Sequence, residues 1–255
     1  MRLYLIRHAQ SIDNFNLEYP ESYQVYDEFF CPELSNIGEA QARALASFLA
    51  PPKTRKDINP QPSKLFTELS WRGTQFQDVH GFQITHLYAS PAIRAMATAS
   101  IIALALGIRP MVWKDLCEYQ GIWSLDPNTE QVIGQPGPDR QYLAERFPDF
   151  KFQDDFGTGP WWGSQTEDLT QCRHRARRLL GEILQRHGNA NDHVAVITHS
   201  HFYNILLLFL LQIDPDSRVW FAFNNAAITR IDFSNTECSM MYQNRVDFLP
   251  KDLIT

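Results

Sequence analysis

Two histidines and two arginines, spread over three distant segments, are of the types that phosphate chemistry uses. Arg7 and His8 lie near the start of the chain, Arg94 in its middle and His199 towards its end. A guanidinium group stays charged, and its planar fork of donors matches phosphate oxygens. A neutral imidazole is a nucleophile that can carry a phosphoryl group, so His8 or His199 could attack phosphorus. These residues predict a site for a phosphate dianion.

Each of these segments follows a predicted buried strand. Residues 2–6, 84–89 and 194–197 are short apolar runs. Arg7 and His8 come directly after the first run, and His199 comes just after the third. Ser90 and Pro91 follow the second run and predict a helix whose first turn carries Arg94. Because ligands of parallel sheets bind at the carboxyl ends of the strands, we expect the three segments to meet in one cleft.

The remaining elements indicate an α/β fold. We expect helices from Ser35, as N-cap, to residue 50, from 90 to 107, from a capping box at residues 164–167 to 187, and from 202 to 211. Further strands are expected at 110–113 and 226–233. Strands that alternate with helices predict a three-layer α/β/α arrangement with a mostly parallel central sheet. Segments 51–83 and 119–163 show no sustained periodicity, and we interpret them as loop insertions that form a cap on a single domain, residues 1–255.

Composition narrows the class of protein. The chain has 255 residues, 44 % of them hydrophobic, and a formal net charge of −6, which argues against a nucleic-acid partner. Its basic run at 173–178 is expected to be the solvated face of a helix. The four cysteines form no CxxC pair, so we expect reduced, mostly structural thiols and no metal site. No apolar run is long enough for a leader or a membrane span, so we expect a cytoplasmic protein without a membrane partner.

Several motifs along the chain resemble those of the histidine phosphatase superfamily, also called the phosphoglycerate mutase-like family. The matching segments keep the family's order and span nearly the whole chain. They are Leu5-Ile6-Arg7-His8-Ala9-Gln10-Ser11 with Asn14, Leu34-Ser35-Asn36-Ile37-Gly38 with Gln41-Ala42, Ser90-Pro91-Ala92-Ile93-Arg94-Ala95 with Thr98-Ala99, Thr198-His199-Ser200, and Asn225-Ala226-Ala227-Ile228-Thr229.

This resemblance implies a role for each matching residue and a phosphoglycerate mutase-like fold. His8 is then the nucleophile that becomes phosphorylated, and the phosphoryl group is held by Arg7, Arg94 and His199. Ser11 and Asn14 add hydrogen bonds, and the reaction needs no metal or cofactor. Glu118, in Leu116-Cys117-Glu118 before Gly121-Ile122-Trp123, matches the family's proton donor. We expect Glu118 to act as general acid and then general base, with a pKa raised by an apolar cleft.

Other interpretations remain open at several positions. Ala9 and Ser200 stand where the family usually has glycine. The Ser200 hydroxyl could enter the phosphate pocket or could cap the helix expected from residue 202. Asn14 could be only a turn former. The acidic residues near Glu118, namely Asp115, Asp126 and Glu130, are rivals for its role.

The function predicted first is metal-independent hydrolysis of a small phosphate monoester, a phosphorylated metabolite, through phospho-His8. A phosphoglycerate mutase-type transfer would use the same groups, and a binding or scaffold protein with an unused site is the third interpretation. The sequence leaves open which phosphoester is the substrate. It also leaves open the oligomeric state, with a dimer as one option.

Overall fold

The computed structural model describes residues 1–18, 31–51, 78, 81–125, 128–129, 131–163, 165–214, 216–234 and 237–255. Most of the first predicted insertion, 51–83, lies outside these residues, as do Asp126 and Glu130. None of the helices in the described ranges has both the length and the apolarity needed to cross a membrane.

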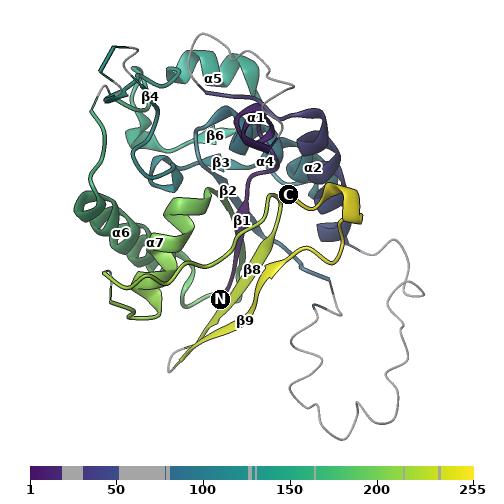
Figure 1. Ribbon diagram of the computed structural model, residues 1–255. Helices are drawn as coiled ribbons and strands as arrows, with labels where there is room; N and C mark the ends of the chain where they lie inside the picture. Colours follow the sequence, from purple (N-terminus) through teal and green to yellow (C-terminus); the bar gives the residue numbers. More distant parts are fainter. Residues whose placement is uncertain are drawn as a thin grey trace, which may run out of the picture.

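A seven-stranded sheet runs through the centre of the molecule in the order β6-β3-β2-β7-β1-β8-β9 (Figure 1). The first five strands in this order are parallel, β8 pairs antiparallel to β1, and β9 pairs antiparallel to β8 at that edge. The sheet is therefore mostly parallel, as predicted. The strands are β1 (Arg2–Arg7), β2 (His86–Ala89), β3 (Met111–Val112), β6 (Lys151–Phe152), β7 (His193–Thr198), β8 (Ile228–Phe233) and β9 (Cys238–Arg245).

Helices cover both faces of the sheet because successive strand residues point to opposite sides. On β1, Tyr4 and Ile6 join one buried cluster, and Leu3 and Leu5 join the other. The first cluster includes side chains of α2 (Asn36–Leu49) and α4 (Ile93–Leu106), and the second includes those of α6 (Leu169–His187) and α7 (Ser200–Leu210). The two pairs of helices lie on either side of the sheet in Figure 1, which confirms the three-layer α/β/α prediction.

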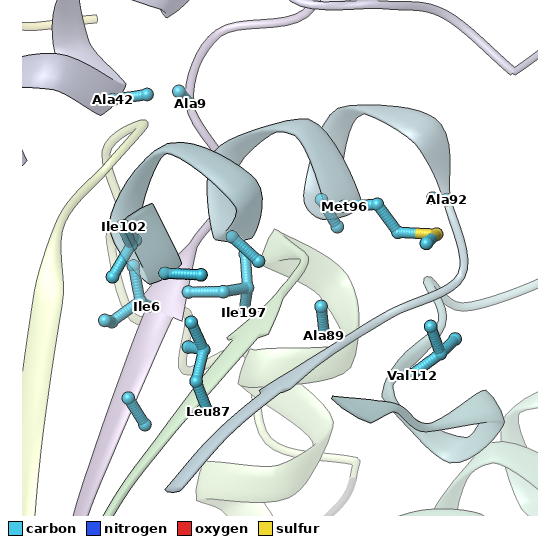
Figure 2. Close-up of a cluster of buried hydrophobic side chains, with 14 of the residues drawn as sticks. Ile6, Ala9, Ala42, Leu87, Ala89, Ala92, Met96, Ile102, Val112 and Ile197 are labelled. Atoms are coloured by element: carbon cyan, nitrogen blue, oxygen red, sulfur yellow. The ribbon is translucent and has the colours of Figure 1, made fainter. Parts of the chain in front are cut away.

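The packing of α4 on the sheet is tight and mainly apolar. Figure 2 shows Ile6, Leu87 and Ile197, one from each of three neighbouring strands, beneath Met96 and Ile102 of the helix. These side chains are at most 2 % exposed. The close contact fixes the start of α4, and with it Arg94, relative to the ends of β1 and β7.

Some predicted helix starts were right and others wrong. Ser35 caps α2 by accepting the Gly38 N–H at 3.0 Å, as predicted. Helix α4 begins at Ile93 with Ala92 in the N-cap position, so Ser90 does not cap it. The predicted capping box at 164–167 was also wrong, because α6 is capped by Asp168, whose box partner is Gln171.

The second predicted insertion, residues 119–163, has more regular structure than expected. It contains the hairpin of β4 (Trp123–Leu125) and β5 (Val132–Gly134), helix α5 (Arg140–Arg146) and strand β6. Strand β6 is the edge strand of the central sheet, so this part is not a loop insertion. The hairpin and α5 lie at the end of the sheet towards which β1 runs (Figure 1). The sequence pattern missed these elements because they are short, and it also missed α1 (Ile12–Glu18) and β9.

Candidate active site

The carboxyl ends of β1 and β7 lie side by side, because Arg7 and Thr198 are paired in the parallel register of these strands. The N–H of His8 donates to the Thr198 carbonyl at 3.0 Å, so His8 and His199 leave the sheet together. Their ring centroids are 5.0 Å apart. The start of α4 brings Arg94 to the same place.

Arg94 contacts both histidines. Its Nε donates to His8 Nε2 at 3.3 Å, and its Nη2 is 3.3 Å from His199 Nδ1. A guanidinium group can only donate, so both of these imidazole nitrogens accept. Arg94, His8 and His199 thus form one cluster, as the sequence predicted for the phosphate site.

The hydrogen bonds fix the tautomer of each histidine. His8 Nδ1 lies 2.8 Å from the Ala9 carbonyl, which can only accept, so the ring proton is on Nδ1 and Nε2 has a free electron pair. His199 Nε2 carries its proton and donates to the Ser90 hydroxyl at 2.8 Å. The Nε2 atom of His8 therefore has the electron pair that a nucleophile requires.

Burial and positive charge keep both rings neutral. Burial, followed by the charges of Arg94 and Arg7, lowers the pKa of His8 well below its usual value. Burial and the charge of Arg94, then His8, do the same to the pKa of His199. A neutral His8 at ordinary pH is the nucleophilic form, and the two arginines provide the positive charge of the site.

Arg7 is partly buried beside this cluster. Its Nη1 donates to the Phe223 carbonyl at 2.6 Å, while its Nε is buried and has no hydrogen-bond partner among the described residues. Burial lowers the pKa of Arg7 to about 10, so it remains charged at neutral pH. A buried donor on a charged group without a partner is costly, and such groups are typical of sites that receive an anion.

Ser11 and Asn14 lie in the turn that follows His8. The Asn14 side-chain oxygen accepts hydrogen bonds from the Ser11 backbone N–H at 3.3 Å and from its hydroxyl at 3.2 Å. It also accepts one from Asn225 at 3.1 Å, and the same Asn225 amide donates to the His8 carbonyl. These bonds hold the turn in place, which is a positioning role for Ser11 and Asn14, whatever they bind.

Helix α2 holds the same turn from the other side. The Gln10 N–H donates to the Gln41 side chain at 2.7 Å, and the Ser35 N–H donates to the Gln10 carbonyl at 3.0 Å. A Cβ at Gly38 would overlap this carbonyl, so only glycine allows α2 to approach so closely. The Leu34-to-Gly38 motif thus acts on the backbone next to His8.

Glu118 is held by the amino terminus of α7 rather than by the histidine cluster. Its Oε1 accepts N–H groups of Tyr119 and Phe202, both at 2.8 Å, and its Oε2 accepts that of His201 at 3.2 Å. His201 Nδ1 is 3.8 Å from Oε2. Burial opposes ionisation, but the His201 interactions and the backbone N–H groups outweigh it and lower the pKa of Glu118. The raised pKa predicted from the sequence was therefore wrong, because the helix end supplies donors that the sequence does not reveal.

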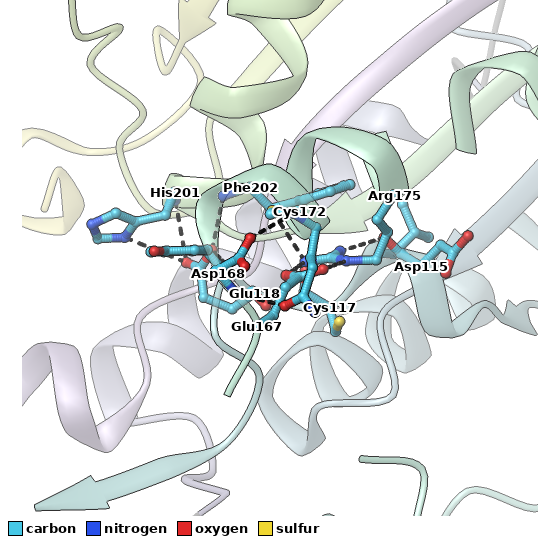
Figure 3. Close-up of polar contacts among 12 residues, drawn as sticks. Asp115, Cys117, Glu118, Glu167, Asp168, Cys172, Arg175, His201 and Phe202 are labelled. Carbon is cyan, nitrogen blue, oxygen red and sulfur yellow. Dashed lines mark hydrogen bonds and ion pairs between the residues drawn. The ribbon is translucent and has the colours of Figure 1, made fainter. Parts of the chain in front are cut away.

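Arg175 positions the segment that carries Glu118 (Figure 3). It donates to the backbone carbonyls of Asp115, Cys117 and Glu118 at 2.7, 2.9 and 3.3 Å. Its Nε and Nη2 also form a two-point ion pair with Glu167 at 2.8 and 2.6 Å. Both side chains are buried, so the prediction that the run 173–178 is a solvated face was wrong at Arg175.

Two further predictions concern Ala9 and Ser200. Ala9 is fully buried and its N–H donates to the Thr98 hydroxyl at 3.1 Å, so the methyl group fits where the family has glycine. Ser200 is the first residue of α7, and His199 occupies the N-cap position. The helix expected from Phe202 thus starts two residues earlier, and the Ser200 side chain does not cap it.

Three polar residues make contacts that the sequence did not predict: Ser90 was expected to cap a helix, and Thr98 and Asn225 were quoted only as parts of motifs. Ser90 binds His199, Thr98 joins the Ala9 N–H to the Arg94 carbonyl, and Asn225 ties Asn14 to the His8 carbonyl. All three are buried polar side chains. In the sequence, Ser90 and Thr98 lie four residues before and after Arg94, and Asn225 opens the motif at 225–229.

A possible metal ligand set among the described residues lies far from this cluster. His86, His187 and Asp192 have ligand atoms within 4.8 Å of one another. His86 and Asp192 lie at the amino ends of β2 and β7 and His187 ends α6, whereas His8 and His199 follow carboxyl ends of strands. His187 uses Nδ1 for Asp192 at 2.7 Å and Nε2 for the Tyr88 hydroxyl at 3.0 Å. These contacts form a hydrogen-bonded chain that accounts for the cluster.

Comparison with known families agrees with this arrangement. The profile of the histidine phosphatase superfamily, branch 1, matches residues 73–245, which include Arg94, Glu118 and His199. The chain belongs to the histidine phosphatase superfamily. A search of the curated proteins found no match.

Solved structures with the same fold include two phosphatases. Phosphoserine phosphatase from Entamoeba histolytica is 17 % identical, with 98 % of this chain and 99 % of that chain covered and a TM-score of 0.54. A mycobacterial glucosyl-3-phosphoglycerate phosphatase is 18 % identical, with 96 % and 99 % covered and a TM-score of 0.54. At this identity the likeness shows the fold.

Proposed function

We propose that this chain is a metal-independent phosphatase that hydrolyses a small phosphate monoester through a phosphohistidine on His8. The observation that carries the proposal is the pairing of an unprotonated His8 Nε2 with Arg94, His199 and the Nε of Arg7, which has no hydrogen-bond partner in the described part of the chain. We also propose that residues 1–255 form one domain, because the strands of the central sheet come from both ends of the chain.

In the first step, His8 Nε2 attacks phosphorus and the ester P–O bond breaks. The Arg94 N–H that now points at His8 donates instead to a phosphoryl oxygen, and Arg7 Nε binds another. The negative charge of the phosphate favours a second proton on His199, whose Nδ1 then also donates. These donors stabilise the charge spread over the phosphoryl oxygens in the transition state.

The leaving oxygen takes its proton from Glu118. In the free protein the pKa of Glu118 is lowered, while its carboxylate raises the pKa of His201. A bound phosphate dianion, which has the same sign of charge as the carboxylate, raises the pKa of Glu118 and so favours its protonated form. In the second step, Glu118 accepts a proton from the water that attacks phospho-His8, which releases inorganic phosphate and restores both groups.

Ser11, Asn14 and Ser200 are proposed contacts of the phosphate. They follow His8 and His199 in sequence and share the turns that position these rings. The substrate is a phosphorylated metabolite. Solved structures of the Entamoeba enzyme hold phosphoserine and 3-phosphoglyceric acid, and such small phosphate esters are suitable first candidates.

Release of inorganic phosphate in the presence of EDTA tests this function. The substrates are p-nitrophenyl phosphate and a panel of metabolite phosphates, and the variants are His8→Ala and a control, His174→Ala, at an exposed histidine of α6. We expect activity in the wild type and the control and none in His8→Ala. Activity that depends on 2,3-bisphosphoglycerate would instead indicate a mutase, and an inactive, folded wild type would indicate a binding protein.

A further inference from the structure

A cavity of about 500 Å³ lies next to Glu118, outside the histidine cluster. It is bounded by the start of α6, by one face of α7 and by the segment 212–220 that follows α7. Small-molecule sites have volumes of about 300 to 1,000 Å³, so this cavity is of suitable size for an organic group.

The cavity adjoins the proposed reaction centre through His201. This residue lines the cavity, its Nδ1 is 3.8 Å from Glu118 Oε2, and its ring centroid is 5.0 Å from that of Trp220. The charge of Arg7 acts on both Glu118 and His201. The segment that carries Trp220 continues to Phe223, whose carbonyl binds Arg7. The proposed phosphate site and the cavity thus share one wall.

The other walls of the cavity are mainly apolar. Trp220 is 56 % exposed and Phe209 is 40 % exposed, although both are large apolar side chains. Exposed apolar groups that gather beside a polar site are typical of ligand-binding surfaces. The remaining apolar lining residues are Leu169, Ile205, Leu208, Ile213 and Val219.

We propose that this cavity binds the organic part of the substrate, and that the substrate is therefore the phosphate ester of an apolar alcohol, aliphatic or aromatic. The inference rests on the proposed phosphatase function and adds the class of leaving group. His201 stands at the boundary, between the apolar walls and the carboxylate that gives its proton to the leaving oxygen. An alkyl or aryl group attached to that oxygen extends towards Trp220.

A leaving group fits the cavity better than a second copy of the chain. A stable protein interface buries about 800 Å² on each partner, which exceeds what a hollow of this volume offers. The charged side chains Arg173 and Asp214 line the cavity and have opposite signs, so its walls do not favour a charged ligand of either sign. A neutral apolar group fits both the volume of the cavity and the balance of charge on its walls.

Hydrolysis of ethyl, butyl and hexyl phosphate tests the inference, because these esters differ in length and hardly in leaving-group reactivity. Burial of one methylene is worth about 0.8 kcal/mol, so kcat/KM should rise about fourfold per methylene, mainly through KM. In Trp220→Ala the rise should fall below about twofold per methylene. The control Leu104→Ala, at an apolar side chain 87 % exposed on α4, should keep the wild-type rise.

Calorimetric binding of the same esters to His8→Ala separates the two proposals. Tighter binding of hexyl than of ethyl phosphate, lost in His8→Ala/Trp220→Ala, supports the cavity even when no ester is hydrolysed and the phosphatase proposal fails. Equal kcat/KM for the three esters in an active enzyme overturns the cavity assignment alone, as does equal affinity. A wild-type dimer that Trp220→Ala converts to a monomer also overturns it, because a second copy then occupies the cavity.

Discussion

Replacing Arg175 by methionine should destabilise the protein strongly and also weaken catalysis. Methionine keeps much of the length of the side chain but removes the charge and all donors. The Glu167 carboxylate would lose its two-point ion pair, and three backbone carbonyls around Glu118 would lose a donor. The side chains of Arg175 and Glu167 are only 6 % and 9 % exposed, so water cannot replace these bonds.

The expected loss follows from this burial. Breaking a buried ion pair costs about 3 to 5 kcal/mol in the free energy of unfolding. In a chain of this size each kcal/mol lowers Tm by about 2 to 4 °C, so Tm should fall by about 6 to 20 °C. Thermal unfolding followed by circular dichroism, with urea unfolding for the free energy, measures the effect. In the double variant Arg175→Met/Glu167→Gln part of the loss should return, because no uncompensated charge remains.

Arg178→Met is the matched control. Arg178 lies on the same helix and forms a two-point pair with Asp115, but its side chain is 55 % exposed. Exposed pairs contribute about 0 to 1 kcal/mol, so Tm should fall by no more than about 4 °C. Equal losses in the two variants would show that burial does not decide the strength of the ion pair.

Four further predictions concern the site and the thiols. Burial and the charges of Arg94 and Arg7 keep the pKa of His8 low, so the ring stays neutral as the pH falls. The acid limb of kcat/KM should therefore lie below pH 6.5, and a limb at or above pH 6.5 contradicts this prediction. Glu118→Gln should slow hydrolysis of alkyl phosphates by about 10²-fold or more. It should slow hydrolysis of p-nitrophenyl phosphate by less than about tenfold, because nitrophenolate leaves without a proton. Equal losses of rate with the two kinds of ester would exclude proton donation by Glu118. Ser90→Ala removes the hydroxyl that accepts the hydrogen bond of His199 Nε2. Loss of this bond costs about 1 kcal/mol and should lower kcat/KM about fivefold. Unchanged kinetics would show that the bond does not orient the His199 ring. A thiol reagent should modify one cysteine in the folded protein, the exposed Cys238, and four after unfolding; fast reaction of more than one in the folded state would contradict the described burial of the others.

The sequence predicted the sheet and the residues that gather at its edge. Strand runs such as 194–197 are apolar at every position because helices cover both faces of the sheet, and such runs are easy to recognise. His8 and His199 come just after two of the predicted strands, and Arg94 lies in the first turn of the helix after another. The rule that parallel strands share a carboxyl edge was therefore enough to bring them together.

The sequence could not predict contacts that depend on tertiary packing. Arg175 belongs to a charged run that is amphipathic in pattern, yet the neighbouring segment 115–118 covers it and supplies acceptors. The pKa of Glu118 is lowered by the end of α7, which is adjacent only in space. Short elements such as β6 and the β4–β5 hairpin have too few residues to show a period.

Trapping of the phosphoenzyme tests directly whether His8 is the nucleophile. The enzyme is mixed with p-nitrophenyl phosphate, quenched in alkali within milliseconds to seconds, digested and analysed by mass spectrometry, since phosphohistidine survives alkali and is lost in acid. We expect a phosphoryl group on the peptide that contains His8, on that ring alone, with none in His8→Ala. A phosphoryl group on another residue, or none during steady turnover, would contradict it.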